Sequence, residues 1–209
     1  MKRKRSDEEN EKKSPRKLAG AAVLQASVTA ALYRALFEEW AESGYAALRM
    51  ERIAARAGVG KAALYRRWKS KRDFVYEAVE RTATAITPFP NTGSLAEDVL
   101  AITRSFAIVL RHPLVRRILP DLHAERARSD ELDELVVRVG QDRRSQGLAL
   151  IERAVERGEL SKATDREMAL DFLIAPLYWA IIVQRRKLNA KEIDGIAATV
   201  TISIRNMTR

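Results

Sequence analysis

The sequence predicts an all-α protein of about nine helices, and three observations favour that class. Apolar side chains recur at helical spacing along most of the chain, and residues 94–209 contain no convincing strand pattern. Apolar residues make up 46% of the 209 positions, which is enough for a real core. Residues 87–93 interrupt the helical pattern with two prolines and a glycine. This break predicts a junction between a small N-terminal domain and a larger helical domain.

The first 17 residues form a charged tail with eight basic and four acidic side chains. Because it has so few apolar residues, we expect this segment to be disordered in isolation. Three interpretations stay open: an arm that contacts DNA, a bipartite nuclear localisation signal, and a solubilising tail. A signal peptide is not expected, because this charged terminus lacks an apolar run.

Two amphipathic helices are expected in the N-terminal domain. Residues 21–43 carry an apolar side chain at every fourth position from Leu24 to Trp40, which places these side chains along one face. Residues 70–85 show a similar apolar face, and Ser70 is a good N-cap for that helix. Lys71 lies in its first turn, where free backbone N–H groups also attract phosphate.

Between these helices, residues 53–68 predict a helix-turn-helix. Apolar residues from Ile53 to Ala57 share one face of a short helix. Gly58 follows at once and tolerates the positive φ that a sharp helix exit needs. A second short helix is expected from about residue 61, with Leu64 and Trp68 one turn apart and facing inward.

The outward face of the second short helix is cationic. Its expected members are Lys61, Ala62, Tyr65 and Arg66, with Arg67 at the edge. Residues 44–76 contain nine basic and two acidic side chains, a net charge of +7 out of +10 for the whole chain. A basic surface confined to one small segment is the pattern expected for binding to nucleic-acid phosphates.

Residues 21–79 resemble the TetR family of bacterial transcriptional regulators. The resemblance lies in the motifs A-E-S-G-Y, I-A-A-R-A-G-V, L-Y-R-R-W and S-K, which occur here in that order. It implies a helix-turn-helix at about residues 49–68, with base-edge contacts from Lys61 and Ala62. It implies phosphate contacts from Tyr65, Arg66, Arg67 and Lys71.

Two positions depart from the family pattern. Gly60 stands where the family commonly has a serine, and glycine is still a tolerable N-cap. Leu48 and Arg49 stand where the family has threonine or serine. We expect Arg49 to replace the lost hydroxyl contact to phosphate with a charge-assisted one.

The expected domains are an arm at 1–17, a DNA-binding domain at 18–86, a linker at 87–94 and a regulatory domain at 95–209. Residues 95–111 read as a helix, and a short piece follows between Pro113 and Pro120. Longer helices are expected from Ser129 to about residue 158, from 164 or 165 to 185, and over 191–207.

Residues 172–182 are apolar nearly all round their helix, which predicts cover on every side. A second copy of the chain supplies that cover more readily than one chain does, and the resemblance implies a four-helix bundle across a two-fold axis. We therefore expect a homodimer that binds a pseudo-palindromic operator on double-stranded DNA. The expected interface residues are Leu173, Leu177, Ile181, Ile193, Ile196, Val200 and Ile204.

The resemblance also implies repression that a small-molecule inducer relieves by binding in the second domain. The mainly aliphatic and aromatic surroundings favour an apolar or amphipathic compound. Candidate pocket residues are Arg104, Phe106, Phe172, Tyr178 and Trp179. A family member that activates transcription, or that senses no ligand, is an alternative, as is a sequence-neutral protein of the nucleoid type.

Composition argues against several other classes. No cysteine and only two histidines are present, so we expect no metal site and no cofactor. Residues 60–61 match only part of a nucleotide-binding P-loop and follow a helix, and no catalytic arrangement is evident, so we expect no enzyme. The most apolar stretch, 168–183, is too short for a membrane span. The expected location is the bacterial cytoplasm, in association with the nucleoid.

Overall fold

The computed structural model describes residues 20–84 and 89–207. These ranges contain nine α-helices and no strand, which confirms the all-α prediction. The predicted basic arm at 1–17 lies outside the described residues, as do 18–19, 85–88 and 208–209. In the described ranges, no helix has the length and apolar character needed to cross a membrane.

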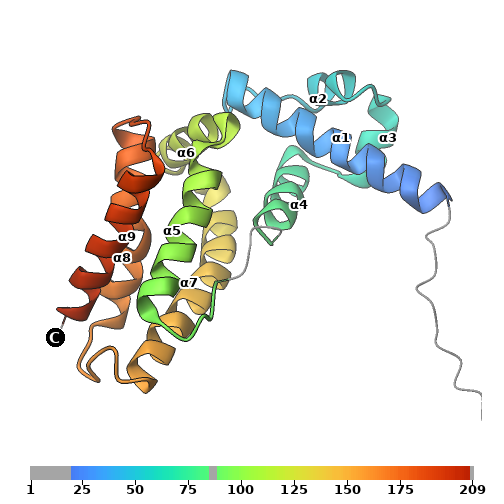
Figure 1. Ribbon diagram of the computed structural model, residues 1–209. Helices are drawn as coiled ribbons and strands as arrows, with labels where there is room; N and C mark the ends of the chain where they lie inside the picture. Colours follow the sequence, from blue (N-terminus) through green and yellow to red (C-terminus); the bar gives the residue numbers. More distant parts are fainter. Residues whose placement is uncertain (1–19, 85–88, 208–209) are drawn as a thin grey trace, which may run out of the picture.

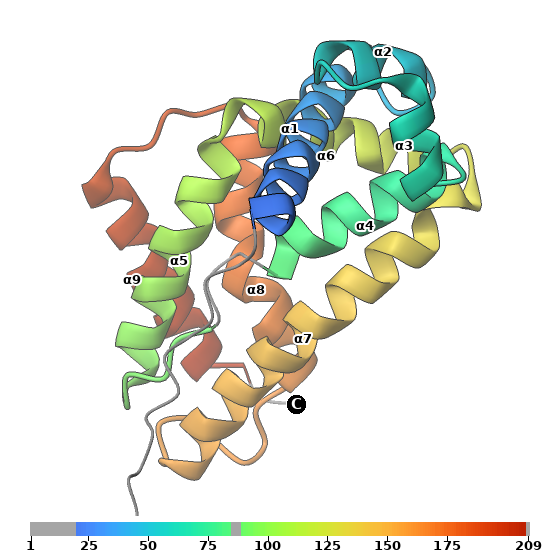
Figure 2. The ribbon, with the colours of Figure 1, turned by 90° about the vertical axis from the view of Figure 1, so that its right-hand side faces the viewer.

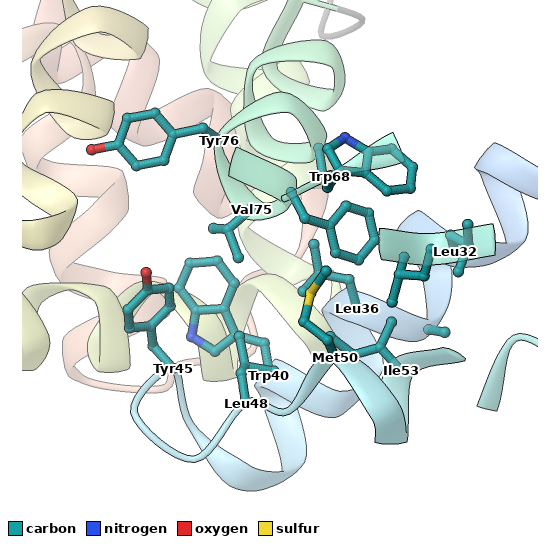
Figure 3. Close-up of a cluster of buried hydrophobic side chains, with 14 of the residues drawn as sticks. Leu32, Leu36, Trp40, Tyr45, Leu48, Met50, Ile53, Trp68, Val75 and Tyr76 are labelled. Carbon is teal, nitrogen blue, oxygen red and sulfur yellow. The ribbon is translucent and has the colours of Figure 1, made fainter. Parts of the chain in front are cut away.

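Four helices build the N-terminal domain (Figure 1). They are α1 (Gly20–Ser43), α2 (Met50–Arg56), α3 (Lys61–Arg67) and α4 (Lys71–Thr84). The inward side chains of α1 include Leu32, Leu36 and Trp40, all buried as the four-residue spacing predicts. Figure 3 shows them packed against side chains from α2 and α4 and the segments beside them. Burial of these large apolar groups is the main force that holds the short α2 and α3 in place.

Five α-helices and two short helical turns build the larger domain. They are α5 (Leu95–Arg111), α6 (Pro113–Arg126), the 3₁₀ turn η1 (Asp130–Leu132), α7 (Asp133–Glu156), α8 (Arg166–Tyr178), the π-helical turn η2 (Trp179–Val183) and α9 (Ala190–Arg205). Figures 1 and 2 show α5 and α9 side by side with α8 behind them, and Figure 2 shows α7 running alongside and below α4. The core between these helices is apolar, with Leu95, Val99, Leu150 and Val200 completely buried.

Two helix ends differ from the sequence expectation. Helix α6 runs through Pro120 as far as Arg126 and is not a short piece between two prolines. Proline removes one backbone donor, but Ile118 and Leu122 on this helix pack against the N-terminal core, and that burial outweighs the loss. Helix α8 ends earlier than expected, because the π-helical turn η2 follows Tyr178, and Arg185 adopts a positive φ of 56°.

The two domains share more than a linker. The buried cluster of the N-terminal domain includes Leu132 and Leu135, which belong to η1 and α7. Helix α6 packs against α1 (Figure 1). Asp121 on α6 accepts hydrogen bonds from the Trp40 indole (2.7 Å) and from the Tyr45 backbone (2.9 Å). The N-terminal domain is therefore held by contacts with the larger domain as well as by its own core.

Candidate nucleic-acid interface

The turn between α2 and α3 is built around Gly58, which has a φ of +66°. Glycine meets no steric penalty in this conformation, whereas other residues do. The Gly58 and Val59 amides donate to the carbonyls of Ala55 and Ala54 (3.1 and 2.9 Å), which closes the end of α2. Val59 packs partly against the core, so α3 leaves the turn at a fixed angle.

The inner side of α3 is anchored in the core. Leu64 is fully buried, and Trp68, which follows the helix, is 4% exposed. The Trp68 indole donates to Glu77 (2.8 Å) and its ring lies 4.3 Å from that of Phe74, centroid to centroid. Glu77 also accepts from the Tyr33 hydroxyl (2.7 Å). These contacts tie α3 to α1 and α4 and leave its opposite side free.

The structure exposes four of the side chains that the sequence places outward on α3, namely Lys61, Ala62, Tyr65 and Arg66. Ala62 has a small side chain, so another molecule can approach the backbone closely at this point. The Tyr65 ring is 38% exposed and carries both an apolar face and a hydroxyl. This edge combines positive charge, a hydrogen-bonding aromatic ring and close backbone access.

Arg67 and Lys71 are partly engaged within the chain. The Arg67 guanidinium donates to the Thr29 hydroxyl (2.7 Å). The Lys71 ammonium donates to the Tyr45 carbonyl (3.2 Å) and lies 4.0 Å from the centre of the Tyr45 ring. Arg67 therefore holds α3 on α1, and Lys71 holds α4 on the link that follows α1. Arg49 is exposed at the extended N-cap position of α2.

An acidic residue, Glu51 on α2, faces the exposed edge of α3, which we call the reading edge. Its Oε1 lies 2.7 Å from the Lys61 ammonium and accepts from the Tyr65 hydroxyl (3.1 Å). The hydrogen bond from Lys61 is the main reason that the pKa of Glu51 falls to about 2. The same contact raises the pKa of Lys61, so the pair stays fully charged at neutral pH.

The +7 count in residues 44–76 overstates the charge available to a partner. Arg52 and Arg56 pair with the buried Glu39 of α1 (2.8 and 3.1 Å), and Arg72 pairs with Glu134 of α7. These pairs fix α2 and α4 in the fold. Within residues 44–76, the exposed basic residues with no acidic contact to the described part of the chain are Arg49, Arg66 and Lys69.

Sequence reasoning missed Glu51 and Lys69 as members of this surface. Both are exposed, and Lys69 lies in the link between α3 and α4. A signal for Glu51 was present, since it is one of only two acidic residues in a basic segment. Its partner Lys61 is ten positions further along the chain, across a turn, so helical spacing alone could not pair them.

The five predicted pocket residues have different surroundings in the structure. Arg104 is exposed and pairs with Asp194 of α9 through two contacts of 2.8 Å. Trp179 is 57% exposed. Phe106 and Tyr178 pack at the edge of one core cluster, and Phe172 packs at the edge of another. Helical spacing marked all five as neighbours of apolar positions, but it could not show which way each side chain points.

A surface hollow of about 670 Å³ lies elsewhere, beside the second half of α7 and the segment before α8. None of the five predicted pocket residues lines it. Its lining residues are Leu148, Ala149, Glu152, Lys162, Ala163, Thr164, Arg166 and Glu167. Five of these eight residues are polar or charged, and the other three are aliphatic.

Six of the seven predicted interface residues are buried inside the single chain, and the seventh, Ile196, is half-buried. The six are Leu173, Leu177, Ile181, Ile193, Val200 and Ile204. They are already covered by their own chain and are not available to a partner. The exposed large apolar residues on these elements are instead Met168, Trp179, Val183 and Ile202. An all-round apolar helix does not reveal which face its own chain covers.

Two family models match this chain. The family described as bacterial regulatory proteins, tetR family, matches residues 32–78, and the family described as tetracyclin repressor-like, C-terminal domain, matches residues 89–200. The first match covers α2 and α3 and the second covers most of the larger domain. Together they span both parts of the fold described above.

Individual relatives agree with that assignment. The uncharacterised HTH-type transcriptional regulator YdeS of Bacillus subtilis is 28% identical over 159 residues, which are 76% of this chain and 80% of that protein. An HTH-type regulator of Mycobacterium bovis is 29% identical over 147 residues, 69% of this chain and 71% of that protein. The structure of MexZ, a repressor responsible for antibiotic resistance in Pseudomonas aeruginosa, matches with a TM-score of 0.66 at 26% identity, over 86% of this chain and 95% of MexZ. This chain belongs to the TetR family and is a DNA-binding transcriptional regulator.

Proposed function

We propose that this chain is a sequence-specific repressor. In this proposal it binds a pseudo-palindromic operator as a homodimer and leaves the operator when a small molecule binds to the larger domain. The observation that carries the proposal is the two-sided character of α3. Its inner side is locked by Leu64 and Trp68, and its outer side exposes Lys61, Tyr65 and Arg66. A rigid helix with an exposed cationic edge suits entry into the major groove.

Selection of bound duplexes from a random pool, with the full chain at moderate salt, tests this proposal. We expect an inverted repeat whose half-site centres lie ~34–36 Å apart, or a multiple of that distance. The selected duplex should bind at least ~10³-fold more tightly than a scrambled one at the same salt concentration. Equal affinity for both duplexes would support the sequence-neutral alternative and contradict the proposal. A reporter gene behind the selected operator separates repression from activation.

The dimer is proposed to form through an exposed apolar stripe on α8, η2 and α9. Met168, Ala175 and Trp179 recur at the spacing of one helical face, and all three are exposed. On α9, which packs beside α8 (Figure 1), Gly195 and Ile202 are exposed two turns apart, and we include them in the proposed stripe. Regulators of this family are generally dimeric. The stripe of one protomer can be buried against the same stripe of its partner across a two-fold axis.

Sedimentation analysis of Trp179→Glu tests this interface. A charge at the centre of the stripe should convert a micromolar dimer into a monomer, because an unpaired buried charge is costly at an interface. Val137→Glu is the matched control, since Val137 is similarly exposed (48%) but lies on α7, away from the stripe. A Trp179→Glu variant that remains dimeric would contradict this assignment of the interface.

The inducer is proposed to be an apolar or amphipathic compound that binds among α5, α6 and α8. Phe106 and Tyr178 lie at the edge of the cluster that these helices share, beside Val115 and Leu119. A thermal-shift screen tests the idea with two compound sets, one apolar and one of small charged metabolites. Stabilisation by the charged set alone would contradict it.

The proposal further holds that the chain acts by binding, without catalysis, at the nucleoid in the bacterial cytoplasm.

A further inference from the structure

Glu51 is an unexpected residue on a surface that approaches DNA. It is exposed on the first turn of α2, beside the outward edge of α3, and a carboxylate in this place repels the phosphate backbone. Asp73 is the only other acidic residue in residues 44–76. A carboxylate at the reading edge lowers the affinity for DNA. A favourable contact with particular bases would offset this loss.

The geometry of Glu51 is fixed by two partners on the neighbouring helix. The Lys61 ammonium lies 2.7 Å from its Oε1, and the Tyr65 hydroxyl donates to the same oxygen from 3.1 Å. The Lys61 ammonium also lies 5.5 Å from the centre of the Tyr65 ring. About half of each charged side chain remains open to solvent, 48% for Glu51 and 61% for Lys61. The pair is therefore pre-arranged and still accessible from outside.

A carboxylate beside an ammonium complements one particular base pair. In the major groove, cytosine presents an amino donor at N4, and its partner guanine presents acceptors at O6 and N7. A carboxylate accepts from the cytosine amino group, and a lysine donates to the guanine acceptors. A carboxylate offers about four acceptor positions, so Glu51 can accept from a base while it keeps Lys61 in place.

We propose that Glu51 and Lys61 together read one G·C base pair in each half-site. This inference rests on the proposed function, because it assumes that the outer edge of α3 enters the major groove. Glu51 is thus a specificity-determining residue: its charge penalises any duplex that does not offer an amino group at this position. Its pairing also draws Lys61 away from phosphates on unrelated DNA, which lowers sequence-independent affinity.

The first test is selection from a random pool with the full-length wild type and three variants. Wild type should select a G·C pair at one position of each half-site, with about tenfold preference or more. Glu51→Gln should lose most of this preference or move it toward adenine, which glutamine recognises. Lys61→Gln should relax the same position and no other. Glu156→Gln, an equal charge change at the far end of α7, should select the wild-type sequence.

The second test is the salt dependence of binding to a duplex that lacks the selected site. Glu51→Gln frees Lys61 for a phosphate contact, so affinity should rise and the slope of log K against log[salt] should steepen by ~0.9 for each bound protomer. Glu156→Gln should leave this slope unchanged. If Glu51→Gln keeps both the wild-type base preference and the wild-type slope, the inference is wrong while the proposed function stands. If wild type itself selects no sequence, the proposed function fails first.

Discussion

Replacing Asp121 by alanine should destabilise the whole protein, because its carboxylate accepts two hydrogen bonds across the boundary between the domains. Its Oδ2 accepts from the Trp40 indole (2.7 Å) and from the Tyr45 backbone amide (2.9 Å). Trp40 is 1% exposed and Tyr45 is fully buried. Asp121→Ala therefore leaves two donors without a protein partner in a largely apolar setting.

The expected cost follows from these contacts. A hydrogen bond to a charged group contributes about 1.5–3 kcal/mol net, so two independent bonds would give about 3–6 kcal/mol. The two bonds share one acceptor oxygen and are not additive. Asp121 is also only half-buried, so some water enters when it is removed. We therefore expect a loss of about 2–4 kcal/mol in the free energy of unfolding. Asp121→Asn keeps the shape and one acceptor, and it should lose about half as much.

Urea unfolding at a fixed protein concentration, followed by tryptophan fluorescence and circular dichroism, measures this loss. With a denaturant slope of about 2–3 kcal/mol/M, the midpoint of Asp121→Ala should fall by about 1 M. Asp142→Ala is the control, since Asp142 is an exposed carboxylate that accepts a hydrogen bond from the Gln146 side-chain amide (2.9 Å), one helical turn away. Its midpoint should move by less than ~0.3 M, given the small worth of such pairs. Equal midpoints for Asp121→Ala and Asp142→Ala would refute the reasoning.

Three further predictions concern other parts of the fold. Lys71→Ala should weaken binding to all duplexes alike and also lower the unfolding free energy by ~1 kcal/mol, because Lys71 lies over the Tyr45 ring; equilibrium titrations and a urea melt measure the two effects. Gly147→Ala should cost ~1–3 kcal/mol by thermal melt, because its new methyl group would overlap Leu170, whereas Gly140→Ala on the same helix meets open space and should not destabilise. The carboxyl of Glu51 should titrate near pH 2 by NMR, and its pKa should return toward the ordinary value in Lys61→Gln. Because the pKa is lower in the folded state, the ion pair stabilises the fold above about pH 4.5. This stabilisation is lost as the pH falls toward 2.

Much of the fold could be predicted from sequence because helical spacing reports burial directly. The four-residue repeat from Leu32 to Trp40 identified the buried face of α1, and Leu64 with Trp68 identified that of α3. Gly58 marked the turn because its positive φ is a local requirement that few other residues meet. Pro120 misled the prediction for α6, because local propensity lost to packing between domains.

The candidate site was less predictable because charge contacts are not local. Arg52 and Arg56 count toward the basic segment in the sequence, yet both pair with Glu39, which lies on a different helix and is 1% exposed. The same limit applied to the predicted interface residues, where Leu177 and Val200 are apolar but already covered by their own chain. Periodicity shows that a side chain needs cover, and only the three-dimensional arrangement shows what covers it.

The contacts between domains constrain how the DNA-binding domain can move. Asp121 on α6 holds the end of α1, Glu131 on η1 accepts from the Tyr45 hydroxyl (2.7 Å), and Glu134 on α7 pairs with Arg72 on α4. These bonds join three separate elements of the larger domain to the smaller one. A hydrogen bond weakens steeply with distance and angle, so a shift of α6 by about one ångström must either break bonds or carry α1 with it. Breaking the bonds would leave donors on the buried Trp40 and Tyr45 without partners, so moving α1 together with α6 costs less free energy than breaking them. The exposed edge of α3 should therefore follow any displacement of α6 as part of one rigid body.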